Sequence, residues 1–263
     1  MPSSPPAPPM VLTFAATDPT GGAGLQADLL TIAALRCHAL SVVTAVTVQD
    51  TSGVRRMLPL DAAAVSEQAS CVLDDVAVAA FKAGVLGSVP NARAVSEVVA
   101  RYAGLPFVVD PVLASGRGDP LAPDDMVDAL RRFIFPLTTV LTPNSIEARC
   151  LAAPDTDPAA CARRLTQDGC KFVLITGTHE AGADVVNTLY DAGGVVSEER
   201  WPRLAGSYHG SGCTLASAIT ARLACGAPAV QAVREAQEFT WQALAAGFRP
   251  GRGQFIPQRV SRS

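Results

Sequence analysis

Residues 11–35, VLTFAATDPTGGAGLQADLLTIAAL, contain the pattern that decides the fold. The run from Val11 to Ala16 is mostly apolar, as is typical of a strand buried in a parallel sheet. A segment rich in turn residues and glycine follows at 18–24, and apolar residues then recur at helical spacing up to Leu35. The stretch therefore predicts a strand, a glycine-rich loop and a helix, in that order.

The same alternation continues along the chain. A second strand at 41–49 is rich in β-branched residues and stops at a polar run that starts with Gln49. Later strands are predicted at 77–83, 106–110, 139–142 and 172–175, and helices at 61–74, 90–103, 123–135 and 158–169. Two strands at 184–190 and 194–201 form an antiparallel hairpin in this prediction, and helices at 212–223 and 228–247 follow.

This alternation predicts the α/β class, as a three-layer α/β/α sandwich with helices on both faces of a mainly parallel central sheet. Ligands bind such sheets beyond the carboxyl ends of the strands. Without an internal repeat or a convincing linker, we expect residues 11–263 to form a single domain. Residues 1–10 contain five prolines and no secretory pattern, so we expect them to be a disordered tail.

The composition narrows the classes of partner. The formal net charge is -3 and no basic cluster is present, which argues against nucleic acid. No apolar run is long enough for a bilayer span, so we expect no membrane partner and a cytoplasmic protein. The seven cysteines form no C-x-x-C pair, which argues against a disulfide framework and a zinc knuckle.

Polar side chains follow several of the predicted strands. Gln49, Asp110, Asn144 and Thr176 each come at or directly after a strand end, and Glu147 follows Asn144 by three positions. The carboxyl ends of parallel strands share one edge of a sheet. We therefore expect these residues to line one cleft.

The strongest local signal is His209-Gly210-Ser211-Gly212-Cys213-Thr214, directly before a helix of small residues. Two glycines let successive N–H groups turn toward one point, and a helix N-terminus favours an anion there. The pattern thus predicts a cradle for phosphate oxygens, with Cys213 as a thiolate base for a substrate hydroxyl. A glycine-containing helix cap beside a buried thiol explains this motif equally well when it is taken alone.

Two nucleotide-binding motifs are absent. Gly21 to Gly24 follows a strand and opens a helix, but the G-x-G-x-x-G spacing is not met and no acidic residue ends the second strand. The sequence also contains no G-x-x-x-x-G-K-[ST]. These absences disfavour a dinucleotide fold and exclude a P-loop enzyme.

The segment from Asn144 to Glu147 has two interpretations. Asn144 is a good N-cap and Glu147 completes a capping box, which is the stronger interpretation of the motif by itself. Glu147 is alternatively a ligand of Mg²⁺ through water, with Asp110 as a second acidic residue near the metal.

Two cationic side chains are candidates for phosphate contacts in a chain that has only two lysines, Lys82 and Lys171, against nineteen arginines. Lys82 ends a predicted strand and faces either the cleft or solvent, and Arg117 lies in a glycine-containing loop from which it reaches phosphates. His179 either orients a phosphate or caps a strand.

The ordered set of motifs resembles the hydroxymethylpyrimidine/phosphomethylpyrimidine kinases of thiamine biosynthesis, from about Val11 to about Gly247. The matching segments are ATDPTGGAGLQAD at 16–28, TAVTVQ at 44–49, DPV at 110–112, GDPL at 118–121, TPNSIE at 142–147 and HGSGCTL at 209–215.

This resemblance implies a ribokinase-like fold, commonly a homodimer, and ATP-dependent phosphorylation of 4-amino-5-hydroxymethyl-2-methylpyrimidine and then of its monophosphate. It implies that Gln49 hydrogen-bonds the aminopyrimidine with Asp28 and Ala23 nearby. Gly210, Ser211 and Gly212 become the anion hole, and Cys213 the base. It also places Asn144, Glu147 and Asp110 around Mg²⁺ and phosphate.

Three departures from the family pattern stand out. Thr176-Gly177-Thr178-His179 replaces Lys-Gly-Gly-His, Val85 replaces a methionine of the pyrimidine pocket, and Arg117 lies one place away from the usual cation of its loop. They bear more on the second phosphorylation than on the first.

Two other functions remain open. Pyridoxal or pyridoxine kinases act on a similar hydroxymethyl ring, and comparing turnover of the two alcohols separates these cases. A pyrimidine-binding sensor without catalysis is the third possibility, and the presence of Cys213 and Glu147 argues against it because binding alone needs neither.

Overall fold

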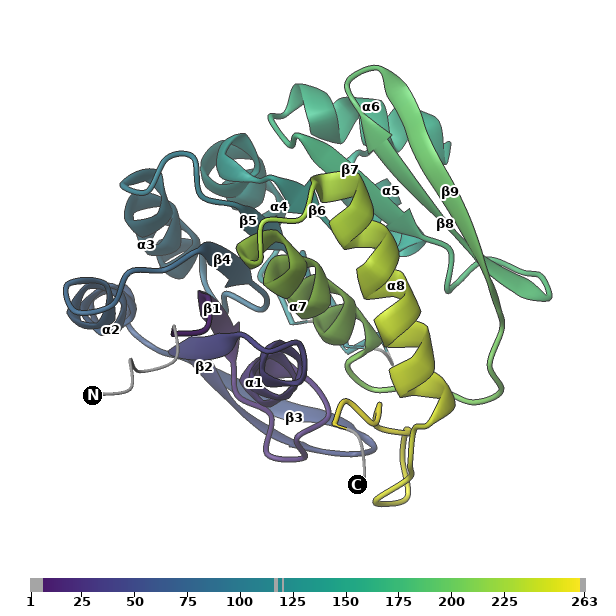
Figure 1. The fold of residues 1–263 in the computed structure, drawn as a ribbon, viewed down its shortest axis with the longest axis horizontal. Helices are drawn as coiled ribbons and strands as arrows, with labels where there is room; N and C mark the ends of the chain where they lie inside the picture. The colour runs from purple at the N-terminus through teal and green to yellow at the C-terminus, as the bar shows by residue number, and fades with distance from the viewer. Residues whose placement is uncertain (1–6, 116–117, 120, 261–263) are drawn as a thin grey trace, which may run out of the picture.

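The computed structural model describes residues 7–115, 118–119 and 121–260, which fold around one central sheet (Figure 1). In this part of the chain the sheet has nine strands in the order β3-β2-β1-β4-β5-β6-β7-β8-β9. The strands from β2 to β7 in that order run parallel, while β3, β8 and β9 each pair antiparallel. The strands are β1 (Met10–Ala16), β2 (His38–Asp50), β3 (Gly53–Pro59), β4 (Ala80–Ala83), β5 (Phe107–Val109), β6 (Val140–Leu141), β7 (Phe172–Thr176), β8 (Asp184–Asp191) and β9 (Gly194–Pro202).

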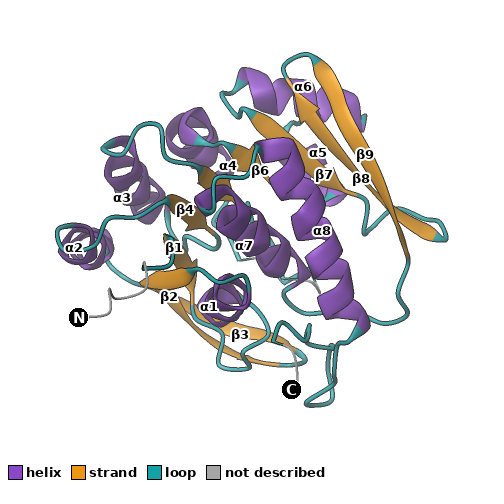
Figure 2. Ribbon diagram, viewed as in Figure 1, coloured by secondary structure: helices purple, strands orange, loops and turns teal. Residues whose placement is uncertain are grey.

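Helices cover both faces of this sheet, which confirms the predicted three-layer α/β/α class (Figure 2). One face carries α1 (Gly24–Ala34), α7 (Ser211–Ala224) and α8 (Ala229–Ala245). The other carries α2 (Ala62–Leu73), α3 (Val89–Ala100), α4 (Met126–Ala129), α5 (Ser145–Leu151) and α6 (Pro158–Gln167). The helix predicted at 123–135 has mixed geometry, because α4 continues as a π-helix at Leu130–Ile134 and a 3-10 helix at Phe135–Leu137.

The strand sequences explain why the sheet is buried on both sides. Successive side chains of a strand point to opposite faces, and here both sets are apolar. Val11 packs under α1 and α7, whereas Leu12 packs under α2 and α3. In β5, Val108 packs in the same core as Val11, and its neighbour Val109 packs in the same core as Leu12. The continuous apolar runs in the sequence are therefore two cores interleaved along each strand.

Strand β3 is missing from the sequence-based assignment. It pairs antiparallel with the end of β2, and its residues are exposed or half-buried, so no buried apolar pattern marks it. Its two arginines and its final residue, Pro59, are more typical of a loop than of a buried strand. Strand β2 is also longer than predicted, because it begins at His38, where it pairs with the start of β1, and ends at Asp50, which pairs with Gly53 of this edge strand.

The N-terminal boundary differs slightly from the predicted one. Met10 already belongs to β1, and the carbonyl of Pro9 accepts a hydrogen bond of 2.9 Å from the His38 N–H. Residues 1–6 of the expected tail lie outside the described residues. Within the described ranges, no helix has the combined length and apolar character of a membrane span.

Candidate active site

Two glycine-rich loops touch at the carboxyl-end edge of the sheet. Gly210, with φ +78°, lies so close to the first loop that a Cβ on it would be 1.9 Å from the Gly22 carbonyl oxygen. A Cβ on Gly22 would in turn lie 2.5 Å from Cδ2 of His209. Any side chain at either position would overlap the opposite loop, so glycine is required for this backbone contact.

Asp18 organises the first loop and ties it to the second. Its carboxylate accepts hydrogen bonds from the N–H groups of Thr20 (2.8 Å) and Ala23 (2.7 Å) and lies 2.9 Å from Nε2 of His209. Burial alone would raise the pKa of Asp18, but the hydrogen bonds from His209, Thr20 and Ala23 lower it below its ordinary value. A charged Asp18 thus holds the two loops together.

The second loop ends in the first turn of α7, with Gly210 as its left-handed N-cap. Among the described residues, no acceptor is present for the N–H groups of Ser211, Gly212 and Cys213. Gly212 is exposed and Ser211 and Cys213 are half-buried. Unpaired N–H groups at a helix N-terminus are suited to bind phosphate oxygens.

Asp110 faces this turn from the end of β5. A Cβ on Gly212 would lie 3.3 Å from Oδ2 and 3.4 Å from Oδ1 of Asp110. The carboxylate is buried, and its Oδ2 has no hydrogen-bond partner among the described residues. Burial raises the pKa of Asp110 to about 6, and the positive charge of Lys82 opposes that rise.

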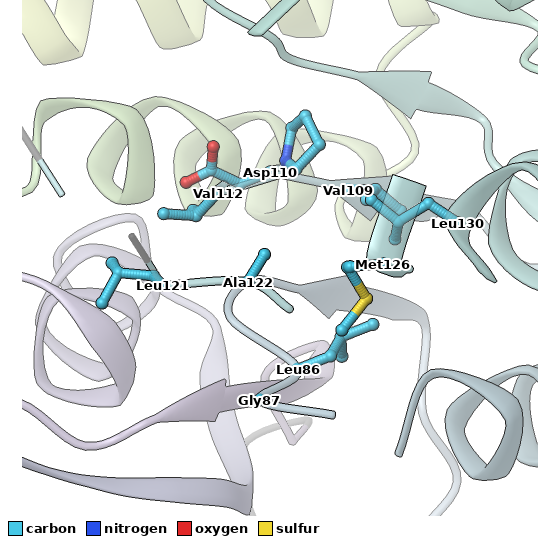
Figure 3. A pocket seen from close by; sticks show the side chains of 11 residues that line it. Leu86, Gly87, Val109, Asp110, Val112, Leu121, Ala122, Met126 and Leu130 are labelled. Carbon is cyan, nitrogen blue, oxygen red and sulfur yellow. The ribbon is translucent and has the colours of Figure 1, made fainter. Parts of the chain in front are cut away.

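A small cavity of about 10 Å³ lies beside Asp110 (Figure 3). Among the described residues Asp110 is the one charged residue of its lining, and Leu86, Leu121 and Met126 are among the apolar ones. A cavity of this size has room for roughly one water molecule. The apolar lining explains why Asp110 is poorly solvated.

Glu147 and Asn144 form a capping box at the start of α5, as one of the two interpretations predicted. Oδ1 of Asn144 accepts the N–H of Glu147 at 2.9 Å, and Oε2 of Glu147 accepts the N–H of Asn144 at 3.0 Å. Burial, followed by the nearby Asp110 charge, raises the pKa of Glu147 to about 8. Two buried carboxyl groups that repel one another are a favourable place for a cation.

The donor set suits Mg²⁺ in particular. No cluster of three or more His, Cys, Asp or Glu able to hold a metal occurs in the described part of the chain. Mg²⁺ is commonly held by one or two carboxylates together with waters and substrate phosphates. Asp110, with its unpartnered Oδ2, and Glu147 fit that role. The described residues around them do not supply the complete set of protein ligands that a structural metal site has.

Lys82 is buried beneath the site, where its charge acts on Asp110 and Cys213, so the solvent-exposed alternative is wrong. Its ammonium is 0% exposed and lies 2.9 Å from each carboxylate oxygen of Asp28, which is also 0% exposed. Asp28 further accepts hydrogen bonds from Thr13 (2.6 Å) and Ser217 (2.7 Å). The structure therefore places Asp28 in the core beneath the two loops, away from the cleft surface where substrate contact was expected.

Cys213 differs from the sequence-based expectation in its protonation. Burial raises the pKa of its thiol to about 12, and the charges of Asp110 and Asp28 raise it further, although Lys82 and the Gly24 N–H oppose them. This shift is opposite in direction to the low pKa that the position at a helix start predicts, and the role of Cys213 as the base stays a prediction. The helix N-terminus alone does not outweigh burial beside two carboxylates.

Three other predicted residues, Gln49, Val85 and Thr176, lie around the same edge. Gln49 is half-buried at the end of β2, and its Nε2 donates to Thr47 at 2.8 Å. Val85 follows β4, and its carbonyl accepts the Thr44 hydroxyl at 2.6 Å. Thr176 ends β7 beside Asn144, with which it forms an isolated parallel bridge. Arg117 lies outside the described residues, and His179 is exposed.

Asp18, His209 and Arg259 are site residues that sequence reasoning missed. Asp18 and His209 stand inside the quoted motifs, but their pairing joins positions 191 residues apart and leaves no local pattern. Arg259 follows α8, beyond the end of the family-like segment, and contacts both glycine loops.

The comparisons with known proteins bear on this site as a whole. The family model described as Phosphomethylpyrimidine kinase matches residues 18–258, which include both glycine loops, Asp110, Glu147 and Cys213. The chain belongs to the phosphomethylpyrimidine kinase family. Membership confirms the family resemblance and the ribokinase-like α/β fold, and it places the chain among phosphotransferases.

Individual relatives of this family agree with the assignment. The hydroxymethylpyrimidine/phosphomethylpyrimidine kinase of Streptomyces coelicolor is 42% identical over 260 residues, covering 96% of this chain and 94% of the relative. The crystal structure of phosphomethylpyrimidine kinase from Clostridium difficile has a TM-score of 0.77 and 32% identity, covering 90% of this chain and 99% of that one.

A second kind of kinase is also similar to this chain. Pyridoxal kinase from Staphylococcus aureus, in complex with AMP-PCP and pyridoxal, has a TM-score of 0.87 and 28% identity, covering 96% of this chain and 94% of that one. The fold of the phosphomethylpyrimidine kinase family is thus shared with enzymes whose ring substrate differs.

Proposed function

We propose that this chain transfers the γ-phosphoryl group of ATP to the hydroxymethyl oxygen of 4-amino-5-hydroxymethyl-2-methylpyrimidine, and then phosphorylates the monophosphate. The observation that carries this proposal is the first turn of α7, whose N–H groups lack acceptors among the described residues and whose Gly212 lies beside the Asp110 carboxylate. A phosphoryl group in transfer spreads negative charge over its oxygens, and fixed donors stabilise that charge.

The chain's own residues divide the remaining tasks. Gln49, half-buried at the end of β2, hydrogen-bonds the aminopyrimidine, while Ala23 and Val85 line the ring pocket. Cys213 accepts the proton of the attacking hydroxyl. Thr176 and Arg117 contact the nucleotide phosphates, with Asn144 holding the turn beside Thr176.

Asp110 and Glu147 hold Mg²⁺ in this proposal, directly or through water. The ion would neutralise phosphate charge during transfer. Support comes from the unpartnered Oδ2 of Asp110 and from the raised pKa of Glu147, whose proton a bound cation would displace.

The raised pKa of Cys213 gives the proposed base a pH signature. A thiol with a pKa of about 12 is almost fully protonated near neutrality, and its thiolate fraction rises about tenfold for each pH unit. Turnover should therefore increase with pH across the neutral and mildly alkaline range. A flat pH profile would exclude a free thiolate as the rate-determining base.

We further propose that the protein is a cytoplasmic homodimer with one domain spanning residues 11–263. The exposed outer side of the β2–β3 edge supports a protein contact, since Val46, Val48 and Leu58 are each at least 40% exposed there. Light scattering on the purified chain measures the mass directly, and a monomer across the concentrations used for turnover would contradict the dimer.

Pyridoxal kinase is the second candidate, because a pyridoxal kinase of Staphylococcus aureus superposes on this chain with a TM-score of 0.87. An ATP-dependent assay with the pyrimidine alcohol, its monophosphate and pyridoxal distinguishes the candidates. Faster phosphorylation of pyridoxal would replace the first proposal. Binding of the pyrimidine without any phosphorylation would indicate a sensor.

A further inference from the structure

Arg259 is buried between the two glycine-rich loops, although it comes from the segment after α8. Its guanidinium Nε donates to the Thr214 hydroxyl at 2.9 Å. Nη1 donates to the Gly21 carbonyl at 3.3 Å, and Nη2 donates to the carbonyls of Gly22 and Gly210. The residue is 4% exposed. A single side chain therefore binds the backbone of both loops.

These bonds fix the orientation of the peptide planes. The C=O and N–H groups of a trans peptide point in opposite directions. Because the Gly210 carbonyl faces Arg259 and Thr214, the N–H of Ser211 faces away from them. The Gly22 carbonyl also faces Arg259, and the N–H of the next residue, Ala23, donates to Asp18. Arg259 thus aims the first N–H of α7.

The positive charge of Arg259 has no carboxylate in direct contact among the described residues. Among the described residues it forms no ion pair within 4.0 Å, and its hydrogen bonds end on neutral oxygens. Burial lowers its pKa, although Arg remains charged under all ordinary conditions. A buried cation without a paired carboxylate raises the positive potential at the neighbouring helix turn, where an anion would be stabilised.

We propose that Arg259 is a positioning residue for phosphoryl transfer, acting by holding the Gly22 and Gly210 peptides so that the N–H groups of α7 point at the transferred group. The inference rests on the proposed kinase activity at this turn. It adds to that activity a requirement on the C-terminal segment, which touches no reacting atom.

The test compares Arg259→Ala with Arg252→Gln, which changes an exposed arginine of the same segment. Arg259→Ala should lower kcat roughly 10- to 100-fold, somewhat less than the 10²–10³-fold loss on deleting an oxyanion donor itself. The KM for the pyrimidine should stay within about twofold, because the substrate ring is held elsewhere. Added guanidinium ion at millimolar concentration should restore part of kcat. Arg252→Gln should leave every parameter unchanged.

Several results would overturn the proposal. They are a kcat within about twofold of the unmodified protein, an equal loss in Arg252→Gln, or a loss confined to the KM for the pyrimidine. If Arg259→Ala does not fold, Arg259→Lys keeps the buried charge but presents no planar fork of donors, so the same fall in kcat is expected. Full activity in Arg259→Lys would then overturn it.

Amide hydrogen exchange separates this inference from the kinase proposal. Loosening of the clamp should speed exchange in 20–24 and 208–214 of the Arg259 variants while core strand β5 stays protected. Absence of ATP-dependent turnover in the unmodified chain would refute the kinase function but would not change this expectation. Unaltered exchange in both loops would refute the clamp.

Discussion

Replacing Lys82 with methionine tests how the floor of the site is built. Lys82 and Asp28 form an ion pair in which both side chains are 0% exposed and the ammonium lies 2.9 Å from each carboxylate oxygen. In Lys82→Met the Asp28 carboxylate keeps its hydrogen bonds from Thr13 and Ser217 but loses its counter-charge. Removing one partner of a buried pair typically costs about 3–5 kcal/mol of unfolding free energy.

That cost is large against the total stability of a domain, which is about 5–15 kcal/mol. Removing both charges should be much less harmful, because replacing a whole buried pair is often neutral. In Asp28→Asn/Lys82→Met the asparagine Oδ1 can still accept a hydrogen bond from one of the Thr13 and Ser217 hydroxyls, and its Nδ2 can donate to the oxygen of the other, so we expect the double variant to recover most of the loss. The two substitutions should therefore be strongly non-additive.

Urea unfolding of the two single variants and the double variant measures this coupling. Arg93→Met is the matched control, because Arg93 and Glu97 form an ion pair on an exposed helix surface, where such pairs contribute about 0.3–0.5 kcal/mol. A loss below about 1 kcal/mol for Lys82→Met, or additive single variants, would show that this pair does not behave as a desolvated ion pair.

Three further predictions concern the cleft. Cys213→Ala should reduce turnover by roughly 10²–10⁴-fold while pyrimidine binding survives in calorimetry, and an unchanged rate would exclude Cys213 as the base. Gly210→Ala should abolish turnover and lower the urea midpoint, because it combines a left-handed φ of +78° with overlap on Gly22, whereas Gly226→Ala, with φ +85° and open space, should show the backbone strain alone. The pKa of Glu147 rises from 4.5 to about 8 on folding, so the folded state binds its proton more tightly and stability from this group falls as pH rises through that window. Glu147→Gln should remove that fall in urea unfolding across the window and weaken Mg²⁺ binding at the alkaline end, and an unaltered pH profile would contradict the raised pKa.

The alternation of strands and helices in this protein could be predicted from the sequence. Most of the parallel strands are apolar runs with a polar residue at or directly after their end, and this pattern located the sheet and gathered Asp110, Asn144 and Thr176 at one edge. Strand β3 was not predicted, because an exposed edge strand buries neither face and its sequence therefore shows no periodic apolar pattern.

The electrostatics of the site could not be predicted in the same way. The position of Cys213 at a helix start indicated a stabilised thiolate, but the sequence does not show that Asp110 and Asp28 approach the same thiol. The position of Lys82 at a strand end was visible, while its partner Asp28 lies 54 residues earlier on α1. Such shifts depend on distances between elements, which local patterns do not contain.

The hydrogen bonds of Arg259 also have a consequence for the order in which the protein is made. Synthesis proceeds from the N-terminus, so both glycine loops leave the ribosome before Arg259, which donates to the backbone of both, has been made. A nascent chain that has already formed its sheet and α7 still has Gly22 and Gly210 without their common guanidinium partner. The segment after α8 can therefore join this cleft only late in synthesis, and a chain interrupted before Arg259 would carry the whole sheet with its loops joined through Asp18 and His209 but without the guanidinium.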